Sequence, residues 1–118
     1  MDLFSSYKLL DEWTTPVSLS KTINTSANEN YPFLLPDGIT LYYASDGENS
    51  LGGYDIFLTK YAASSKDYLT PENAGFPFNS TANDYMMVID EHQKTGWFAT
   101  DRNQPNGKVI VYSFSFSD

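Results

Sequence analysis

The polar loop after the sequence LYYAS has the residue types and spacing that come closest to a chemical site. In DGENSLGGYD, Asp46, Glu48 and Ser50 occupy alternate positions, and Asp55 follows five residues after Ser50. Oxygen ligands at this spacing suit Ca²⁺, a hard ion that prefers carboxylates and carbonyls. The loop lacks the complete calcium-loop consensus and its final bidentate glutamate. The sequence therefore favours an ordinary loop between strands, with no metal and no other cofactor.

Carboxylates are frequent along the whole chain, and a pair of them is what a glycoside hydrolase needs. Aspartate also has simple structural uses, because it accepts hydrogen bonds from backbone amides in turns and at strand ends. Asp46 and Asp101 end equivalent segments, so a repeat explains them better than catalysis does. His92 is the one histidine and there is no cysteine, which leaves little for a metal cage or a thiolate nucleophile. We expect no enzyme, and a hydrolase is the last-ranked alternative.

Size and composition fit a single domain over residues 1–118. The chain has 41% hydrophobic and 16% aromatic residues, too many for a disordered segment. Its 7 basic and 15 acidic residues give a net charge of −8, which repels nucleic acids and anionic lipid surfaces, so we expect no nucleic-acid partner. No apolar run approaches the roughly 20 residues that span a bilayer. The N-terminus lacks the basic and apolar regions of a signal peptide.

The sequence repeats itself with a period of 55 residues. Asn24 aligns with Asn79, and LYYASD at 41–46 aligns with GWFATD at 96–101. A period of this size indicates stacked supersecondary units. We place the first repeat unit at about residues 13–67 and the second at about residues 68–118. In the third strand the glycines suggest a spacing of 54, which pairs Gly53 with Gly107 and Ile56 with Ile110.

Each unit has the pattern of three antiparallel strands, and no helix longer than a turn or two is expected. In the first unit the turn Pro36-Asp37-Gly38 and the pair Gly52-Gly53 separate the strands, and the glycine pair is expected to turn the chain back. Both faces of the middle strand are largely apolar, so both need a cover. Ala44 and Ala99 are small and would let a facing sheet approach closely. The strands are expected at 31–35, 39–45 and 54–61 in the first unit, and at 85–90, 97–100 and 108–114 in the second.

The first unit resembles the TolB-type, WD-like β-propeller repeat of bacterial envelope proteins. In that family a Pro-Asp-Gly turn joins the first two strands of a blade. A strand ending in Ala/Ser-Ser/Thr-Asp follows, and a Gly-Gly-x-Asp-Ile-Tyr/Phe segment opens the third. The second unit departs from this pattern, because DEHQKTG replaces the short turn and Lys108-Val109 replace Tyr54-Asp55; the resemblance covers roughly residues 13–114. The matching residues are Pro36, Asp37, Gly38, Ala44, Ser45, Asp46, Gly52, Gly53, Asp55, Ile56 and Phe57.

The resemblance predicts an all-β fold of two units similar to propeller blades. A blade takes four strands and a closed propeller about 4–8 blades, so two units cannot close a ring alone. We favour part of a longer chain. A small β-sandwich is the alternative fold, and self-association of several copies to complete a ring is a further possibility.

The resemblance also implies a periplasmic or outer-membrane-associated location in a Gram-negative bacterium. The expected function is a non-catalytic module that binds or scaffolds, with another protein or cell-wall material as its partner. The alternative is a carbohydrate-binding module, because aromatic rings anchor ligands at binding surfaces. Tyr42 and Trp97 lie on the same face of equivalent strands and are the first candidates for such a surface.

Overall fold

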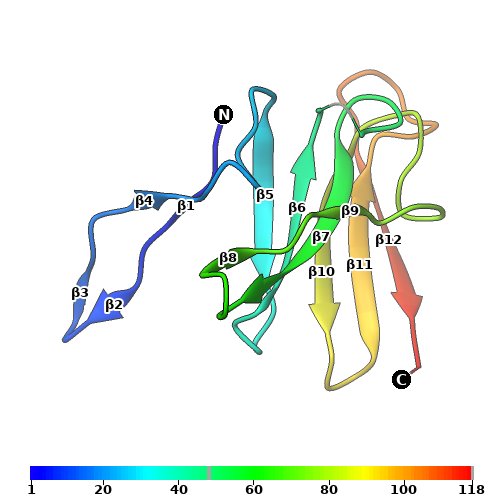
Figure 1. Ribbon diagram of the computed structural model, residues 1–118. Helices are drawn as coiled ribbons and strands as arrows, with labels where there is room; N and C mark the ends of the chain where they lie inside the picture. Colours follow the sequence, from blue (N-terminus) through cyan, green and yellow to red (C-terminus); the bar gives the residue numbers. More distant parts are fainter. Residues whose placement is uncertain (48, 118) are drawn as a thin grey trace.

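The computed structural model describes residues 1–47 and 49–117, and every regular element in them is a β-strand. The protein is all-β, as predicted. No helix in these residues is long and apolar enough to cross a membrane. The two main sheets stand side by side, and a narrow N-terminal ribbon projects from them (Figure 1). The strands are β1 (Phe4–Ser5), β2 (Lys8–Leu9), β3 (Glu12–Trp13), β4 (Val17–Ser18), β5 (Glu29–Leu34), β6 (Thr40–Ser45), β7 (Asp55–Ala62), β8 (Asp67–Tyr68), β9 (Glu72–Asn73), β10 (Asp84–Asp90), β11 (Thr95–Thr100) and β12 (Ile110–Ser115).

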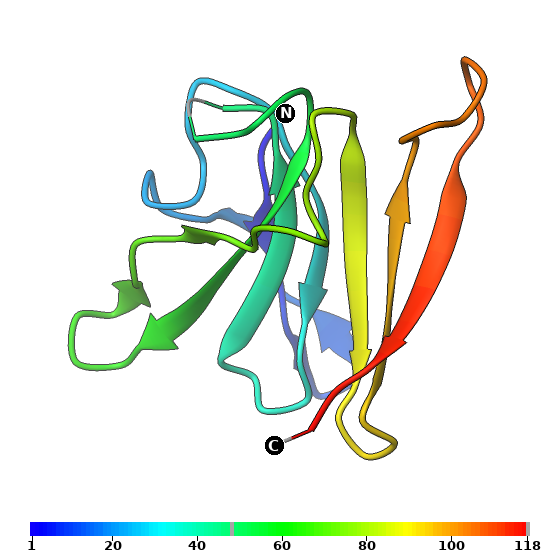
Figure 2. The same ribbon diagram turned by 90° about the vertical axis from the view of Figure 1, so that its right-hand side faces the viewer.

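Two antiparallel meanders form the body of the molecule. The first contains β5, β6 and β7, and the second contains β10, β11 and β12. Figure 2 shows the second meander as a separate sheet beside the first. Each of the six strands lies within two residues of its predicted position at both ends. β8 and β9 extend the first sheet by pairing with β7, whereas β12 is the last strand of the second sheet in the described part of the chain.

The pairing of the third strands corrects one detail of the predicted repeat. Ser45 pairs with Asp55, and Thr100 pairs with Ile110. Ile110 therefore occupies the place of Asp55, and its predicted equivalence with Ile56 is wrong by one residue. The period is 55 residues in this strand as well.

The glycines that suggested the shorter spacing meet two different needs. Gly107 has a φ of +82°, a left-handed conformation that glycine adopts without strain. Gly53 has no such φ, and a Cβ there would overlap the side chain of Asn83. A Cβ at Gly52 would overlap the backbone of Thr81. The Gly-Gly pair therefore makes room for a loop of the second unit, and the chain also bends at both glycines before β7 begins.

The turn between β5 and β6 is closed by an aspartate. The Asp37 carboxylate accepts hydrogen bonds from the N–H groups of Ile39 (2.8 Å) and Thr40 (2.9 Å), and Gly38 has a φ of +72°. These backbone donors lower the pKa of Asp37 below its usual value. Asp37 and Gly38 thus have the turn roles that the Pro-Asp-Gly sequence predicts.

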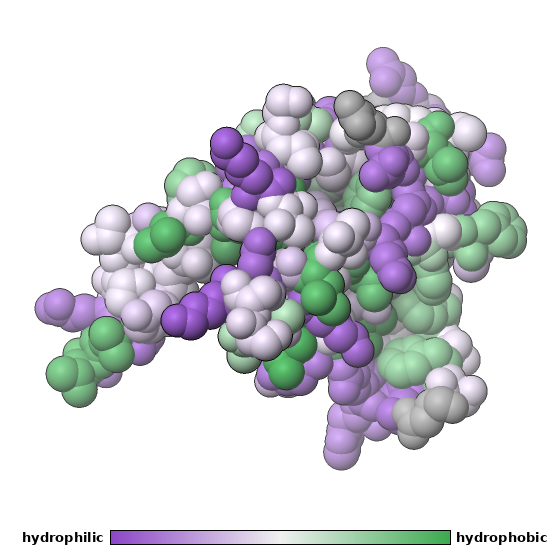
Figure 3. Space-filling model, viewed as in Figure 1, coloured by the Kyte–Doolittle hydropathy of each residue, from purple (hydrophilic) through white to green (hydrophobic). Residues whose placement is uncertain are grey.

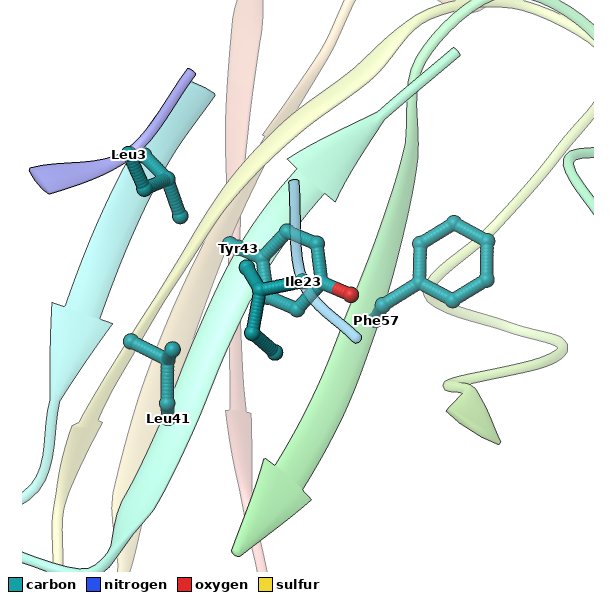
Figure 4. Packing of buried hydrophobic residues seen from close by; sticks show 5 residues of the cluster. All are labelled: Leu3, Ile23, Leu41, Tyr43 and Phe57. Atoms are coloured by element: carbon teal, nitrogen blue, oxygen red, sulfur yellow. The ribbon is translucent and has the colours of Figure 1, made fainter. Parts of the chain in front are cut away.

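Two apolar clusters cover the two faces of the first sheet. Alternation along β6 sends Leu41 and Tyr43 to one face and Tyr42 to the other. Burial on both faces is what the sequence of this strand predicts. The front cluster consists of Leu3, Ile23, Leu41, Tyr43 and Phe57 (Figure 4). The back cluster lies between the two sheets and is built on Ile56, Met87 and Phe98.

The N-terminal segment repeats the third strand of the first unit, which the sequence did not predict. β1 pairs with β4 as β7 pairs with β9: Phe4 lies opposite Ser18, and Phe57 lies opposite Asn73. The ribbon of β2 and β3 likewise corresponds to the pairing of β7 with β8. The segment therefore carries a third strand of the repeat, built from two-residue pieces instead of one eight-residue strand.

Candidate functional site

An asparagine fastens each connector to the third strand that precedes it. Asn79 accepts a hydrogen bond from the Ile56 N–H at 2.7 Å and donates one to the Ile56 carbonyl at 2.8 Å. Asn24 bonds in the same way to the N–H (2.7 Å) and the carbonyl (2.8 Å) of Leu3. Both asparagines are buried. We call this arrangement the asparagine clasp. Asn24-Thr25-Ser26 and Asn79-Ser80-Thr81 also match the N-x-S/T glycosylation pattern, and the clasp gives both asparagines a structural role.

An aspartate holds the loop that leads into each unit. Asp46 accepts hydrogen bonds from the N–H (2.8 Å) and the side-chain amide (3.2 Å) of Asn28. Asp101 accepts the same two bonds from Asn83, at 2.8 and 2.9 Å. The donated hydrogen bonds lower the pKa of both carboxyl groups. Asn83 also accepts from the N–H of Tyr54 at 2.9 Å, so this contact links the second unit to the first.

One buried acid lies at the start of the first strand of each unit. Glu29 accepts hydrogen bonds from the N–H (3.0 Å) and hydroxyl (2.7 Å) of Thr25 and from the hydroxyl of Ser45 (3.0 Å). Asp84 accepts from Ser80 and Thr100, the residues 55 positions further on. Both carboxylates are fully buried, and burial of a carboxylate requires such partners. Their geometry fits a structural role in the repeat.

Arg102 adds a cation in the second unit only. Its guanidinium forms an ion pair with Asp84 at 3.0 Å and donates to the Phe78 carbonyl at 2.5 Å. It also lies over the Phe98 ring, 5.3 Å from the centroid. Arg102 thus ties the buried acid, the connector and the aromatic core of this unit together.

Asp55 differs from the other acids because one of its oxygens has no partner. Its Oδ2 accepts hydrogen bonds from the Leu51 N–H (2.7 Å) and the Asn73 amide (2.8 Å). Its Oδ1 is buried without a hydrogen bond among the described residues. Burial raises the pKa of Asp55, and the neighbouring Asp84 charge raises it further.

The residues named as metal candidates are engaged in separate hydrogen bonds. Asp46 binds Asn28, Asp55 binds Leu51 and Asn73, and the Ser50 hydroxyl donates to backbone carbonyls of its own loop. Glu48 lies outside the described residues. Within residues 1–47 and 49–117, no group of three histidine or acidic side chains is close enough to hold a metal ion.

Tyr42 and Trp97 occupy equivalent positions but do not lie on one surface. Tyr42 packs against the back cluster and lines a cavity of about 370 Å³ between the two sheets. Burial raises the pKa of Tyr42, and the charge of Glu91 adds to the effect. Trp97 lies on the outer face of the second sheet and is 36% exposed. Of these two residues, Trp97 is therefore the one on an outer surface.

A larger, polar hollow of about 760 Å³ opens beside the front cluster. Its lining includes Thr25, Asp46 and Asn49 together with the rings of Tyr43 and Phe57. The two rings are stacked with centroids 6.0 Å apart, and each is less than a tenth exposed. Hydroxyl, carboxylate and amide groups beside aromatic rings can bind sugars or the edge of a β-strand.

Three tyrosines from separate segments meet where the two units join, a grouping that the sequence analysis did not predict. The rings of Tyr31, Tyr54 and Tyr85 lie 5.6–6.2 Å apart, and the Tyr85 hydroxyl donates to Asp101 at 3.2 Å. Tyr31 has a φ of +52° at an irregularity of β5, which is uncommon for a bulky residue. The cluster depends on tertiary packing, so spacing alone could not reveal it.

Comparisons with models of protein families, with curated proteins and with solved structures find no match to this chain.

Proposed function

We propose that this protein is a non-catalytic binding or scaffolding module of the TolB-type propeller kind, which acts in a bacterial cell envelope. The observation that carries this proposal is that, in both units, acidic side chains are occupied in hydrogen bonds that hold loops and strands in place. Asp46 and Asp101 hold equivalent asparagines, and Glu29 and Asp84 hold equivalent hydroxyl groups. These side chains are occupied in structural hydrogen bonds. Binding through the surface is therefore the function that the geometry supports best.

The proposed partner is another protein or cell-wall material. Trp97 is an aromatic side chain on a main sheet face that can reach it, since it is 36% exposed and tryptophan is enriched among residues that dominate binding energy. The outer face of the second sheet also exposes Val109 and Val111, at 52% and 62%. An exposed apolar face of this kind commonly marks an interaction site.

Carbohydrate recognition is the second candidate, and the polar hollow beside Tyr43 and Phe57 favours it. The hollow is large enough for a small sugar, and its hydroxyl, carboxylate and amide groups suit sugar hydroxyls. The two candidates differ in location, because the hollow lies beside the front cluster whereas Trp97 lies on the far side of the second sheet.

The test is sedimentation with purified peptidoglycan sacculi, combined with a glycan array. We expect the wild-type chain to pellet with sacculi or to bind array sugars if cell-wall material is the partner. Trp97→Ala should reduce binding through the outer face, and Asn49→Ala should reduce binding in the hollow. Both side chains are accessible, so neither change should unfold the protein.

The same incubation also tests the non-catalytic assignment. Soluble sugar or peptide fragments released from the sacculi by the wild-type chain would contradict it. Binding that neither substitution changes would place the contact elsewhere. No binding to sacculi or glycans would leave a protein as the remaining partner.

A further inference from the structure

The connectors dock on third strands by a two-point contact that occurs twice in this chain. The Ala74 N–H donates to the Ile56 carbonyl at 2.9 Å, and Asn79, five residues later, closes the clasp on the same residue. At the N-terminus, the Leu19 N–H donates to the Leu3 carbonyl at 3.1 Å, and Asn24 again follows five residues later. The docking rule is thus a backbone N–H followed at a fixed spacing by an asparagine.

Val111 offers a third copy of the docking site. Val111 pairs with Ala99 on β11 as Ile56 pairs with Ala44 on β6. Since Ile56 turns its N–H and carbonyl away from β6 and toward Asn79, the same register directs those of Val111 to the outer edge of β12. That edge has no strand partner among the described residues.

The sheet face around this edge is apolar and uncovered. Trp97, Val109 and Val111 are 36%, 52% and 62% exposed. Hydrophobic side chains gather over the right-hand side of the molecule, where Figure 1 draws β12 (Figure 3). In the first sheet the equivalent face, with Tyr42 and Ile56, is covered by the second sheet.

The opposite end of the same chain presents the complementary surface. The front cluster is buried within one chain, and the hollow of about 760 Å³ opens beside its Tyr43 and Phe57. Part of its cover is the N-terminal segment, whose strands have only two residues with exposed side chains and whose buried attachment is the Asn24 clasp on Leu3. A short, exposed ladder of this kind opens at low free energy.

We infer that the chain associates head to tail with a second copy of itself. In this contact, the connector at residues 16–24 of one copy leaves its own Leu3 and docks on the outer edge of β12 in the other copy. Asn24 of the first copy clasps Val111 of the second, and Trp97 of the second covers the front cluster of the first. Trp97 then has the place that Tyr42 holds between the two sheets of one chain. The contact is heterologous, so it builds a ring or an open chain of copies.

This association does not depend on the proposed binding role. Its strength is expected to depend on the salt concentration. Each copy has a net charge of −8, so copies repel each other at long range. Screening by salt weakens that repulsion, whereas the apolar and hydrogen-bonding contacts persist. Association should therefore become tighter as the salt concentration rises.

The experiment is size-exclusion chromatography with light scattering on the whole chain, over a dilution series at low and high salt. We expect a mass of 13.3 kDa at high dilution and a larger mass at high concentration. Val111→Asp should weaken association at least tenfold without unfolding the monomer, because the side chain is exposed. Trp97→Ala should weaken it by a smaller factor. Ile39→Asp adds the same charge at another exposed position and should behave like the wild type.

Three results would overturn the inference. The first is a mass that stays at 13.3 kDa at every concentration and salt level. The second is association that Val111→Asp leaves unchanged. The third is association that Ile39→Asp weakens as much as Val111→Asp does, since that would show a general charge effect. Circular dichroism on each variant confirms that the compared proteins are folded.

Discussion

The molecule contains two junctions built on the same polar contacts, and they differ in what lies behind those contacts. At the central junction, Asn79 clasps Ile56 in an eight-residue strand of a five-stranded sheet. At the N-terminal junction, Asn24 clasps Leu3 beside strands of only two residues. The hydrogen-bond distances are nearly equal. The comparison suggests that the clasp sets the register of a junction, whereas the sheet behind it sets the strength.

The largest expected effect comes from removing the central clasp. Asn79→Ala leaves the N–H and carbonyl of Ile56 without this partner in a buried place, which should lower the free energy of unfolding by about 3 kcal/mol. Asn24→Ala should cost less in global stability and should release mainly residues 1–18. Urea denaturation measures the first effect, and amide hydrogen exchange locates the second. Equal global losses for the two variants would contradict the comparison.

The next effect concerns the close approach of the two units at Gly53. Gly53→Ala places a Cβ on the side chain of Asn83 and should destabilise the protein by about 2 kcal/mol. Gly47→Ala is the matched control, because the atoms nearest to its Cβ would be Ser45 Oγ at 3.3 Å and Ala27 Cβ at 3.4 Å. Thermal unfolding of both variants tests the point. A tolerated Gly53→Ala would mean that the central junction is looser than the structure shows.

A smaller, pH-dependent effect separates Asp55 from the other acids. Burial raises the pKa of Asp55, so the native protein binds this proton more tightly than the unfolded chain does. The contribution of Asp55 to stability is therefore present at low pH, and it is lost as the pH rises from the usual aspartate value through the raised native value. Asp55→Asn removes this titration and can donate toward Asp84.

We expect Asp55→Asn to be more stable than the wild type at pH 7, by about 1 kcal/mol, because it relieves an unpaired buried oxygen. The difference should disappear as the pH falls below the usual aspartate value. Urea denaturation at several pH values measures it. Asp46→Asn should show the opposite sign, since hydrogen bonds lower the pKa of Asp46 and its stabilisation is lost at low pH. Equal pH profiles for the two variants would contradict the assignment.

The smallest expected effect is at Trp97. In the monomer, Trp97→Ala should change the free energy of unfolding by less than about 1 kcal/mol, because no second sheet covers this side chain. Tyr42→Ala, at the same position of the first unit, should cost about 3 kcal/mol because it opens the packed space between the sheets. Measuring both in dilute solution shows directly what covering by a neighbouring unit contributes. Similar losses would mean that Trp97 is already buried.

Much of the fold followed from short-range patterns in the sequence. The alternation around Tyr42 and Tyr43 predicted a sheet covered on both faces, and the Pro-Asp-Gly sequence predicted the turn that Asp37 closes. Local hydrogen bonding and side-chain period act within a few residues, so a sequence displays them directly. The spacing of 54 in the third strand was wrong because glycine marks both a turn and a close approach.

The contacts of the candidate site were harder to predict because they join residues that are distant in the sequence. Asn83 and Asp101 are 18 residues apart, and their repeat at Asn28 and Asp46 is visible in the sequence only as two matching polar residues. Which groups they bind depends on how the units stack. The N-terminal third strand was missed because only Asp2, Leu3 and Phe4 mark it, and three residues carry little information.

The projecting ribbon of β2 and β3 is expected to be sensitive to proteolytic cleavage. Leu10, at the tip of the ribbon, is 97% exposed, and Leu10 and Asp11 have positive φ values of 48° and 70°. Exposed tips of this kind are preferred sites of cleavage. A cut after Lys8 would separate the N-terminal piece from the chain, yet Asn24 would still hold its Leu3, and Asn28 its amino group. After cleavage, the N-terminal peptide would thus remain bound to the rest of the protein.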